Sequence, residues 1–185
     1  KYVSSATWQA ADAAPIDRLA TGARYLDDGK LHVARFNADG TGQWIELSIG
    51  NADVAAYATY PCANQADGAV HSRIAADAVG ATKMDRPEWC GVHPTTGEIY
   101  FALTNNSNRR LVPSSSSQSA PDAANPRVYS DIKGLATTQQ GNVNGHILRI
   151  KEGTGHAAAL GFTWDVYLFG AEAGAYTGAN KAREG

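Results

Sequence analysis

The stretch that decides the fold is Arg86–Thr104, which reads Arg-Pro-Glu-Trp-Cys-Gly-Val-His-Pro-Thr-Thr-Gly-Glu-Ile-Tyr-Phe-Ala-Leu-Thr. Its middle part, His93–Gly97, contains the proline and glycine that are typical of a tight turn. The flanking segments, Trp89–Val92 and Glu98–Thr104, contain the aromatic and β-branched residues that favour strands. The stretch therefore predicts two strands joined as a β-hairpin.

Further strand-like segments lie on both sides of this hairpin. Gly145–Glu152 and Phe162–Phe169 are predicted to be strands, so residues 86–170 would hold four consecutive antiparallel strands. Residues 30–49 predict another hairpin, because residues 37–42 supply the Asn, Asp and Gly that a reversal needs. Four such strands are typical of one blade of a β-propeller, and the upstream hairpin would belong to a neighbouring blade.

The predicted fold is all-β, with residues 1–185 forming part of a β-propeller, about one and a half blades, with long loops. Two long excursions interrupt the strands. Residues 51–82 are rich in alanine and aspartate without a period of two, and residues 107–143 are so polar that we expect a loop that supplies no core. A β-sandwich is the competing all-β interpretation. Because a propeller needs several blades to close, we do not expect this chain to close by itself.

Charge and hydropathy exclude two classes of partner. The 185 residues include 16 Lys and Arg against 18 Asp and Glu, which excludes the broad basic surface of a sequence-independent nucleic-acid binder. Apolar stretches such as Ile99–Leu103 are far shorter than the roughly 20 residues that span a bilayer, so membrane insertion is not expected. The first residue is Lys1 rather than Met, and we therefore expect a processed or truncated chain.

The two cysteines, Cys62 and Cys90, allow three interpretations. A disulfide between them would suit an exported protein and would contribute roughly 3.6 kcal/mol by closing a loop of this length. In the second interpretation, both residues are free buried thiols. A metal-binding or nucleophilic role for Cys90 is the third interpretation, although no base is identifiable beside it.

The segment Asp85–Trp89 carries the residues best suited to bind a ligand. Pro87 fixes the backbone between Arg86 and Glu88, whose side chains would then point to the same side of an extended segment. An arginine there suits a phosphate, and a carboxylate suits a hard cation, with Asp85 as a further source of oxygens. The first strand of a blade lines the central channel, so these residues would face its mouth. An ordinary ion pair is the alternative interpretation.

Common motifs of nucleotide-binding proteins and hydrolases are missing from the sequence. It contains no Gly-x-x-x-x-Gly-Lys phosphate loop, no Gly-x-Ser-x-Gly elbow and no His-Glu-x-x-His zinc motif. The five histidines are dispersed, and none forms a pair at a metal-ligand spacing. His146 opens a predicted strand and could face the channel mouth, but we expect it to have an ordinary hydrogen-bonded role.

Taken together, Met84–Trp89, Val92–Tyr100 and Leu103–Asn106 resemble the PhoX-type alkaline phosphatases. Other matching segments occur in the order expected of that family, namely Leu31–Gly42, Asn125–Arg127, Gly145–Ile147 and Phe162–Asp165. Each motif is weak by itself, but the combination is specific and covers most of the chain.

The resemblance implies a metal-dependent phosphatase that hydrolyses phosphate monoesters on a six-bladed propeller. Family members are bacterial periplasmic or secreted enzymes, with iron and calcium ions at one mouth of the channel. By this resemblance, Arg86 is the catalytic residue that binds the substrate phosphate, and Glu88 is a metal ligand. Cys90 does not match the cysteine that binds iron in the family.

Family members are several times longer than this chain, which is therefore expected to be a portion of such an enzyme. Its partners would be a phosphate ester and the remaining blades of the same propeller, and the chain alone would be inactive. The alternative function is that of a non-catalytic, calcium-stabilised propeller that acts as a binding or surface-structural protein.

Overall fold

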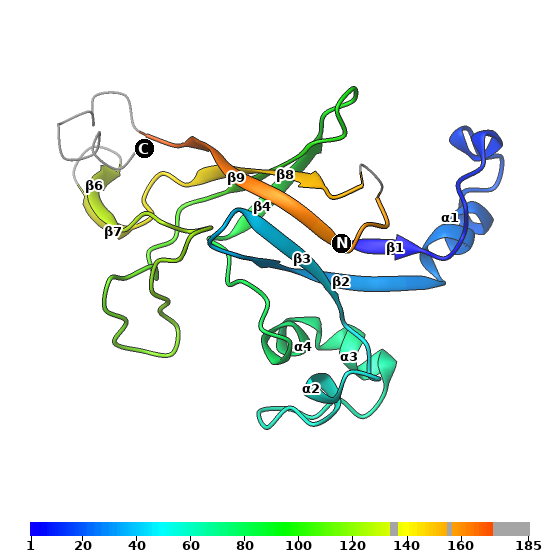
Figure 1. Ribbon diagram of the computed structural model, residues 1–185, viewed down its shortest axis with the longest axis horizontal. Coiled ribbons are helices and arrows are strands. Elements are labelled where there is room, and N and C mark those ends of the chain that lie inside the picture. Colours follow the sequence, from blue (N-terminus) through cyan, green and yellow to red (C-terminus); the bar gives the residue numbers. More distant parts are fainter. Residues whose placement is uncertain (134–136, 155–156, 172–185) are drawn as a thin grey trace. The chain divides into compact units, whose positions relative to one another are not determined.

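The computed structural model describes residues 1–133, 137–154 and 157–171 (Figure 1). The chain divides into two compact units. One comprises Lys1–Arg35 with Gln43–Ala81, and the other comprises Phe36–Gly42 with the chain from Thr82 on. Within the described ranges, no helix is both long enough and apolar enough to cross a membrane.

The first unit contains a small antiparallel sheet and all of the described helices. The sheet has the order β1-β2-β3, formed by β1 (Tyr2–Ser4), β2 (Gly29–Phe36) and β3 (Thr41–Glu46). The helices are the 3-10 helix η1 (Ala10–Ala13), α1 (Arg18–Leu26), α2 (Ala52–Ala55), α3 (Gln65–Val70) and α4 (Ser72–Ala78). The excursion predicted over residues 51–82 therefore contains three short helices.

Side-chain caps explain where three of these helices begin. Asp17, Asn51 and Asn64 precede α1, α2 and α3, and each side chain accepts a hydrogen bond from a backbone N–H of the first turn. The helices then bury small apolar faces. The core of this unit consists of Leu47, Val54, Cys62, Ala75 and Val79.

The second unit is built on a four-stranded antiparallel sheet with the order β9-β8-β5-β4. Its strands are β4 (Pro87–Val92), β5 (Ile99–Leu103), β8 (His146–Glu152) and β9 (Gly161–Phe169). These strands lie where the sequence predicted them, with ends that differ by two residues at most. The assignment of this sheet to one propeller blade stays a prediction.

The sheet register brings four strand ends into one row. Pro87 pairs with Leu103, Leu103 pairs with His146, and His146 pairs with Phe169. Residues just outside these positions must therefore lie close together at one end of the sheet. Leu103 and Leu148 form the small apolar core of the unit together with Ala124.

The turn between β2 and β3 belongs to the second unit and is bound to β9. The indole Nε1 of Trp164 donates hydrogen bonds to the carbonyl oxygens of Asn37 and Thr41, at 3.1 and 2.8 Å. The Trp164 backbone N–H donates to the carbonyl oxygen of Gly40, at 2.8 Å. Gly40 has a φ of +82°, a conformation that a tight turn needs and glycine adopts readily.

The prediction that residues 107–143 form a loop supplying no core is wrong. This segment contains the hairpin of β6 (Tyr129–Lys133) and β7 (Thr137–Gly141). It also buries six side chains, namely Arg109, Ala124, Asn125, Arg127, Asn142 and Val143. Most of them are polar, and they are buried because hydrogen bonds replace the water they lose. A count of apolar residues cannot detect such a core.

Cys62 and Cys90 are free thiols, so the disulfide considered from the sequence is not formed in this structure. Cys62 is buried in the core of the first unit, whereas Cys90 is exposed on β4. The interpretation as two free buried thiols therefore fits Cys62 but not Cys90. Partial burial nevertheless raises the pKa of Cys90 above its ordinary value.

We expect a thiol reagent to distinguish the two cysteines in the folded chain. Cys90 should react first, although more slowly than an unhindered cysteine because its raised pKa lowers the thiolate fraction at neutral pH. Cys62 should react only after unfolding. Peptide mass spectrometry after timed alkylation measures both rates. Equal rates, or protection of both thiols until a reductant is added, would contradict this expectation.

Candidate functional site

An open pocket of about 570 Å³ lies in the second unit, at the end of the sheet where β4 begins and β5 ends. Three chain segments line it. The lining residues are Arg86, Glu88, Leu103, Thr104, Asn105, Val143 and Asn144. The register explains this grouping, because Pro87 pairs with Leu103 and Leu103 pairs with His146.

Glycines allow the third lining segment to approach the end of β5. A Cβ atom at Gly141 would lie 2.2 Å from the carbonyl oxygen of Asn106, and one at Gly145 would lie 2.2 Å from that of Leu103. Both glycines also have positive φ, at +104° and +72°. Any other residue at these positions would push the segment with Val143 and Asn144 away from the pocket.

The backbone of Arg86 is strained. Its φ of +47° is the only positive φ of a non-glycine residue in the described ranges, and such a conformation costs on the order of 1–3 kcal/mol. Three hydrogen bonds hold it. The Arg86 N–H donates to the carbonyl oxygen of Met84 at 3.0 Å, and the Arg86 carbonyl accepts from the N–H and hydroxyl of Thr104 at 3.1 and 3.3 Å. Strained residues are common at ligand-binding sites.

The Arg86 guanidinium has two partners in the pocket. One terminal nitrogen donates to the side-chain oxygen of Asn105 at 2.8 Å, and the other forms an ion pair with Glu88 at 3.3 Å. Both members of the ion pair are more than half exposed, at 59% and 53%. An ion pair this exposed adds little to stability, so both side chains remain accessible from the pocket.

The Glu88 carboxylate could provide one oxygen to a metal ion. Its Oε1 accepts hydrogen bonds from Arg86 and from the Thr104 hydroxyl. Oε2 forms no hydrogen bond or ion pair with the described residues. Those residues contain no cluster of three or more His, Cys, Asp or Glu side chains suited to a metal. Among the described residues, Glu88 is therefore a single candidate ligand and not a complete metal site.

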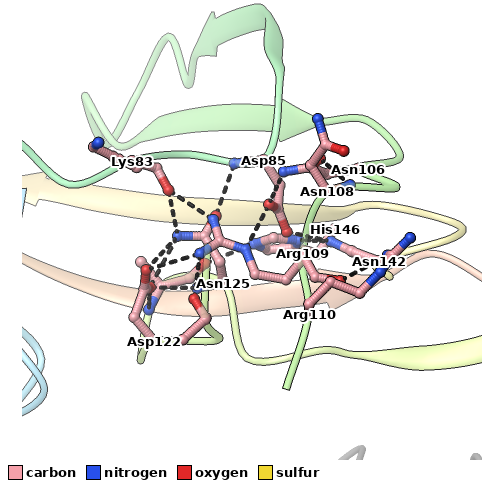
Figure 2. A network of polar contacts seen from close by, with 12 residues as sticks. Lys83, Asp85, Asn106, Asn108, Arg109, Arg110, Asp122, Asn125, Asn142 and His146 are labelled. Carbon is pink, nitrogen blue, oxygen red and sulfur yellow. Dashed lines mark hydrogen bonds and ion pairs between the residues drawn. The ribbon is translucent and has the colours of Figure 1, made fainter. Parts of the chain in front are cut away.

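Asp85 is buried away from the pocket at the centre of a polar network (Figure 2). Its carboxylate accepts hydrogen bonds from Arg109 at 2.9 Å, from Asn106 at 2.7 Å and from Asn142 at 3.0 Å. Asp85 and Arg109 are 0% and 1% exposed. The expectation that Asp85 supplies oxygens to a ligand is therefore wrong, because protein donors already occupy them.

The sequence matches the family described as alkaline phosphatase PhoX over residues 1–185. This chain belongs to that family. The resemblance recognised from the sequence is thus confirmed. No curated protein sequence matches the chain.

A solved PhoX structure shares this fold. It is that of Pseudomonas fluorescens PhoX in complex with vanadate, a transition state analogue, at 36% sequence identity and a TM-score of 0.67. The likeness covers 89% of this chain but 26% of the Pseudomonas chain. The predicted all-β, propeller-like fold is confirmed by this likeness, whereas the number of blades stays a prediction.

The structure of this PhoX family member brings together the two site residues singled out from the sequence. Arg86 and Glu88 form an ion pair in the pocket, although Arg86 adopts a left-handed conformation in place of the extended one expected before a proline. Sequence reasoning missed Thr104 and Asn144. The signal available was their position at strand ends, because Thr104 is the last residue of one predicted strand and Asn144 directly precedes the next, and the register brings these ends together.

His146 has the hydrogen-bonded role expected of it and does not line the pocket. Its ring nitrogens contact the Asn142 side-chain amide at 2.8 Å and the Ala124 carbonyl oxygen at 2.7 Å. A carbonyl oxygen only accepts hydrogen bonds, so Nε2 of His146 carries the proton and donates to Ala124. Nδ1 is then the acceptor of a neutral ring, and the Asn142 amide donates to it. Burial lowers the pKa of His146 below its ordinary value.

This lowered pKa predicts a loss of stability in mild acid. As pH falls below about 6.5, the ordinary histidine pKa, the unfolded chain gains a proton at this position while the folded chain does not. The stability contributed by neutral His146 is therefore present above that pH and declines below it. Chemical denaturation at several pH values should show a weaker decline in the variant His146→Gln. Parallel profiles for the two proteins would contradict the assignment.

Proposed function

We propose that this chain is a portion of a metal-dependent phosphatase that hydrolyses phosphate monoesters, with Arg86 binding the phosphate of the substrate. The observation that carries the proposal is a strained, half-exposed arginine in an open polar pocket of a PhoX family member. Because the chain spans only 26% of the solved relative, the remaining blades would complete the enzyme. The isolated chain should be inactive.

Arg86 would bind two oxygens of the phosphate with its planar guanidinium. Its bond to Asn105 fixes the plane of the group, and its ion pair with Glu88 fixes the rotation about the side chain. Within the described residues, Nε of Arg86 donates no hydrogen bond, so this N–H stays available to a phosphate oxygen. A positioned donor of this kind stabilises the charge that grows on the phosphoryl oxygens during transfer.

Glu88 would help to hold the metal ions, for which we propose iron and calcium as in the family. Such ions polarise phosphoryl oxygens and neutralise negative charge. Calcium takes six to eight oxygen ligands, so segments outside this chain would supply most of them. The Thr104 hydroxyl donates to Oε1 of Glu88, which turns the carboxylate and leaves Oε2 for a cation.

Two further parts of the proposal concern partners and location. We propose that the protein is exported to the bacterial periplasm or secreted, as family members are.

The other blades would pack against strands that still expose large apolar side chains. These are Trp89 and Val92 on β4 and Tyr167 and Leu168 on β9. Large apolar side chains exposed on a sheet favour packing against another part of the protein.

Replacing Arg86 should abolish most of the activity of the complete protein. The variant Arg86→Ala should lower the turnover of an aryl phosphate by a factor of roughly 100 to 1,000, the loss typical of removing one transition-state donor. Arg86→Lys keeps the charge but loses the planar fork, and it should recover only part of the rate. Steady-state kinetics with p-nitrophenyl phosphate provides the measurement. Wild-type rates in Arg86→Ala would overturn the assignment.

Replacing Glu88 should reduce the metal content of the complete protein. The variant Glu88→Gln should bind less metal by elemental analysis, because an amide is a weaker ligand than a carboxylate. Glu98→Gln is the matched control, since Glu98 contacts Thr96 and Tyr100 and does not line the pocket. Iron with calcium in the wild type supports the phosphatase. Calcium alone supports the non-catalytic propeller, and the lack of both contradicts either function.

A further inference from the structure

We propose that Asp85 is a positioning residue that assembles the phosphate pocket without touching its ligand. The proposal rests on the proposed function of Arg86. Its basis is the way in which one buried carboxylate is connected to all three chain segments that line the pocket. The network that makes these connections is drawn in Figure 2.

Each lining segment lies next to Asp85 or next to a residue that binds its carboxylate. Asp85 itself precedes Arg86. Asn106 follows Asn105 in the second segment, and its side-chain amide donates to Oδ1 of Asp85 at 2.7 Å. Asn142 precedes Val143 in the third segment, and its amide donates to Oδ2 at 3.0 Å. The carboxylate is therefore the common partner of the three segments.

The backbone confirms that the second and third segments are joined at these residues. Asn106 and Asn142 exchange backbone hydrogen bonds of 2.8 and 3.1 Å as an isolated bridge. Gly141 permits this approach, because a Cβ atom there would collide with the Asn106 carbonyl oxygen. Asp85 thus binds the side chains of two residues whose backbones already pair.

The same network fixes the backbone that enters Arg86. The Asp85 N–H donates to the side-chain oxygen of Asn125 at 2.8 Å. The Lys83 carbonyl oxygen accepts from Arg109 at 2.7 Å and from the Asn125 amide at 3.2 Å. With the Arg86 carbonyl also held by Thr104, the chain is anchored on both sides of the left-handed residue. A strained conformation persists only where its surroundings hold it in this way.

Arg109 also keeps Asp85 from competing for Arg86. Two carboxylates flank Arg86 in the sequence, and either is close enough along the chain to pair with it. Because Arg109, Asn106 and Asn142 occupy the carboxylate of Asp85, Arg86 pairs only with the exposed Glu88 among the described residues. The guanidinium thus stays in the pocket, where a phosphate can reach it.

A double-mutant cycle in the complete protein tests this role. Asp85→Asn keeps the shape of the side chain but weakens the hydrogen bonds from Asn106 and Asn142. We therefore expect the dissociation constant for inorganic phosphate to rise by roughly tenfold, and the KM for an aryl phosphate to rise by a similar factor. The value of kcat should change less. When Arg86 is already alanine, Asp85→Asn should change phosphate binding by less than about twofold. Calorimetry with inorganic phosphate measures binding independently of turnover.

Two further variants separate positioning from folding. Asp165→Asn is the matched control, because Asp165 pairs with Arg149 in the same unit and does not line the pocket; it should leave phosphate binding unchanged. If Asp85→Asn fails to fold, a double variant that combines it with Arg109→Gln removes both buried charges. This double variant should fold and should still bind phosphate weakly. A double variant that also fails to fold would overturn a specific positioning role.

The outcomes distinguish the two proposals. If Arg86→Ala weakens phosphate binding but Asp85→Asn does not, or if their effects simply add, positioning by Asp85 is wrong and the proposed function stands. If Arg86→Ala itself leaves phosphate binding and hydrolysis unchanged, the proposed function is wrong, and the role of Asp85 falls with it.

Discussion

The buried ion pair between Asp85 and Arg109 is the constraint on which the second unit depends. Moving two charges out of water costs several kcal/mol for each ion, and the cost is offset only when both groups are fully hydrogen-bonded. Here Arg109 donates to Asp85 and to the carbonyl oxygens of Lys83 and Ala120. Satisfying these groups requires segments distant in the sequence to meet at one place. The polar excursion therefore has a defined structure although it contributes few apolar side chains.

The hydrogen-bonded ion pair of Asp85 and Arg109 explains how a unit with a small apolar core can form an open polar pocket. The core residues Leu103 and Leu148 lie on neighbouring strands, and Phe36 extends the core through edge-to-face contacts with Phe162 and Trp164 at 5.2 Å. Apolar burial thus stabilises the sheet, while hydrogen bonds fix the end where the pocket lies. The exposed pair of Arg86 and Glu88 contributes little to either, so the stability of the unit does not depend on it.

The sequence predicted the elements whose signal is local. β8 alternates buried and less buried residues along its length, and the turn at residues 93–97 joins β4 and β5. The proximity of Arg86 and Glu88 was also expected from the sequence, although the extended backbone on which that expectation relied is not the one observed. The structure of residues 107–143 was not, because hydropathy gives no information about which polar groups will satisfy one another. For the same reason the sequence could not show that Asp85, and not Glu88, is the buried carboxylate.

The charges of the site also bear on why metal ions belong in the proposed function. Arg109 compensates the charge of Asp85, and burial keeps His146 neutral, so neither adds a net charge beside the pocket. Arg86 and Glu88 are the charged residues that line it, and their charges cancel. The described part of the chain thus offers a phosphate dianion directional hydrogen bonds but no net positive charge. Cations held at Glu88 and by segments outside this chain would supply that charge, and Arg86 would then act mainly by orienting the phosphate against them.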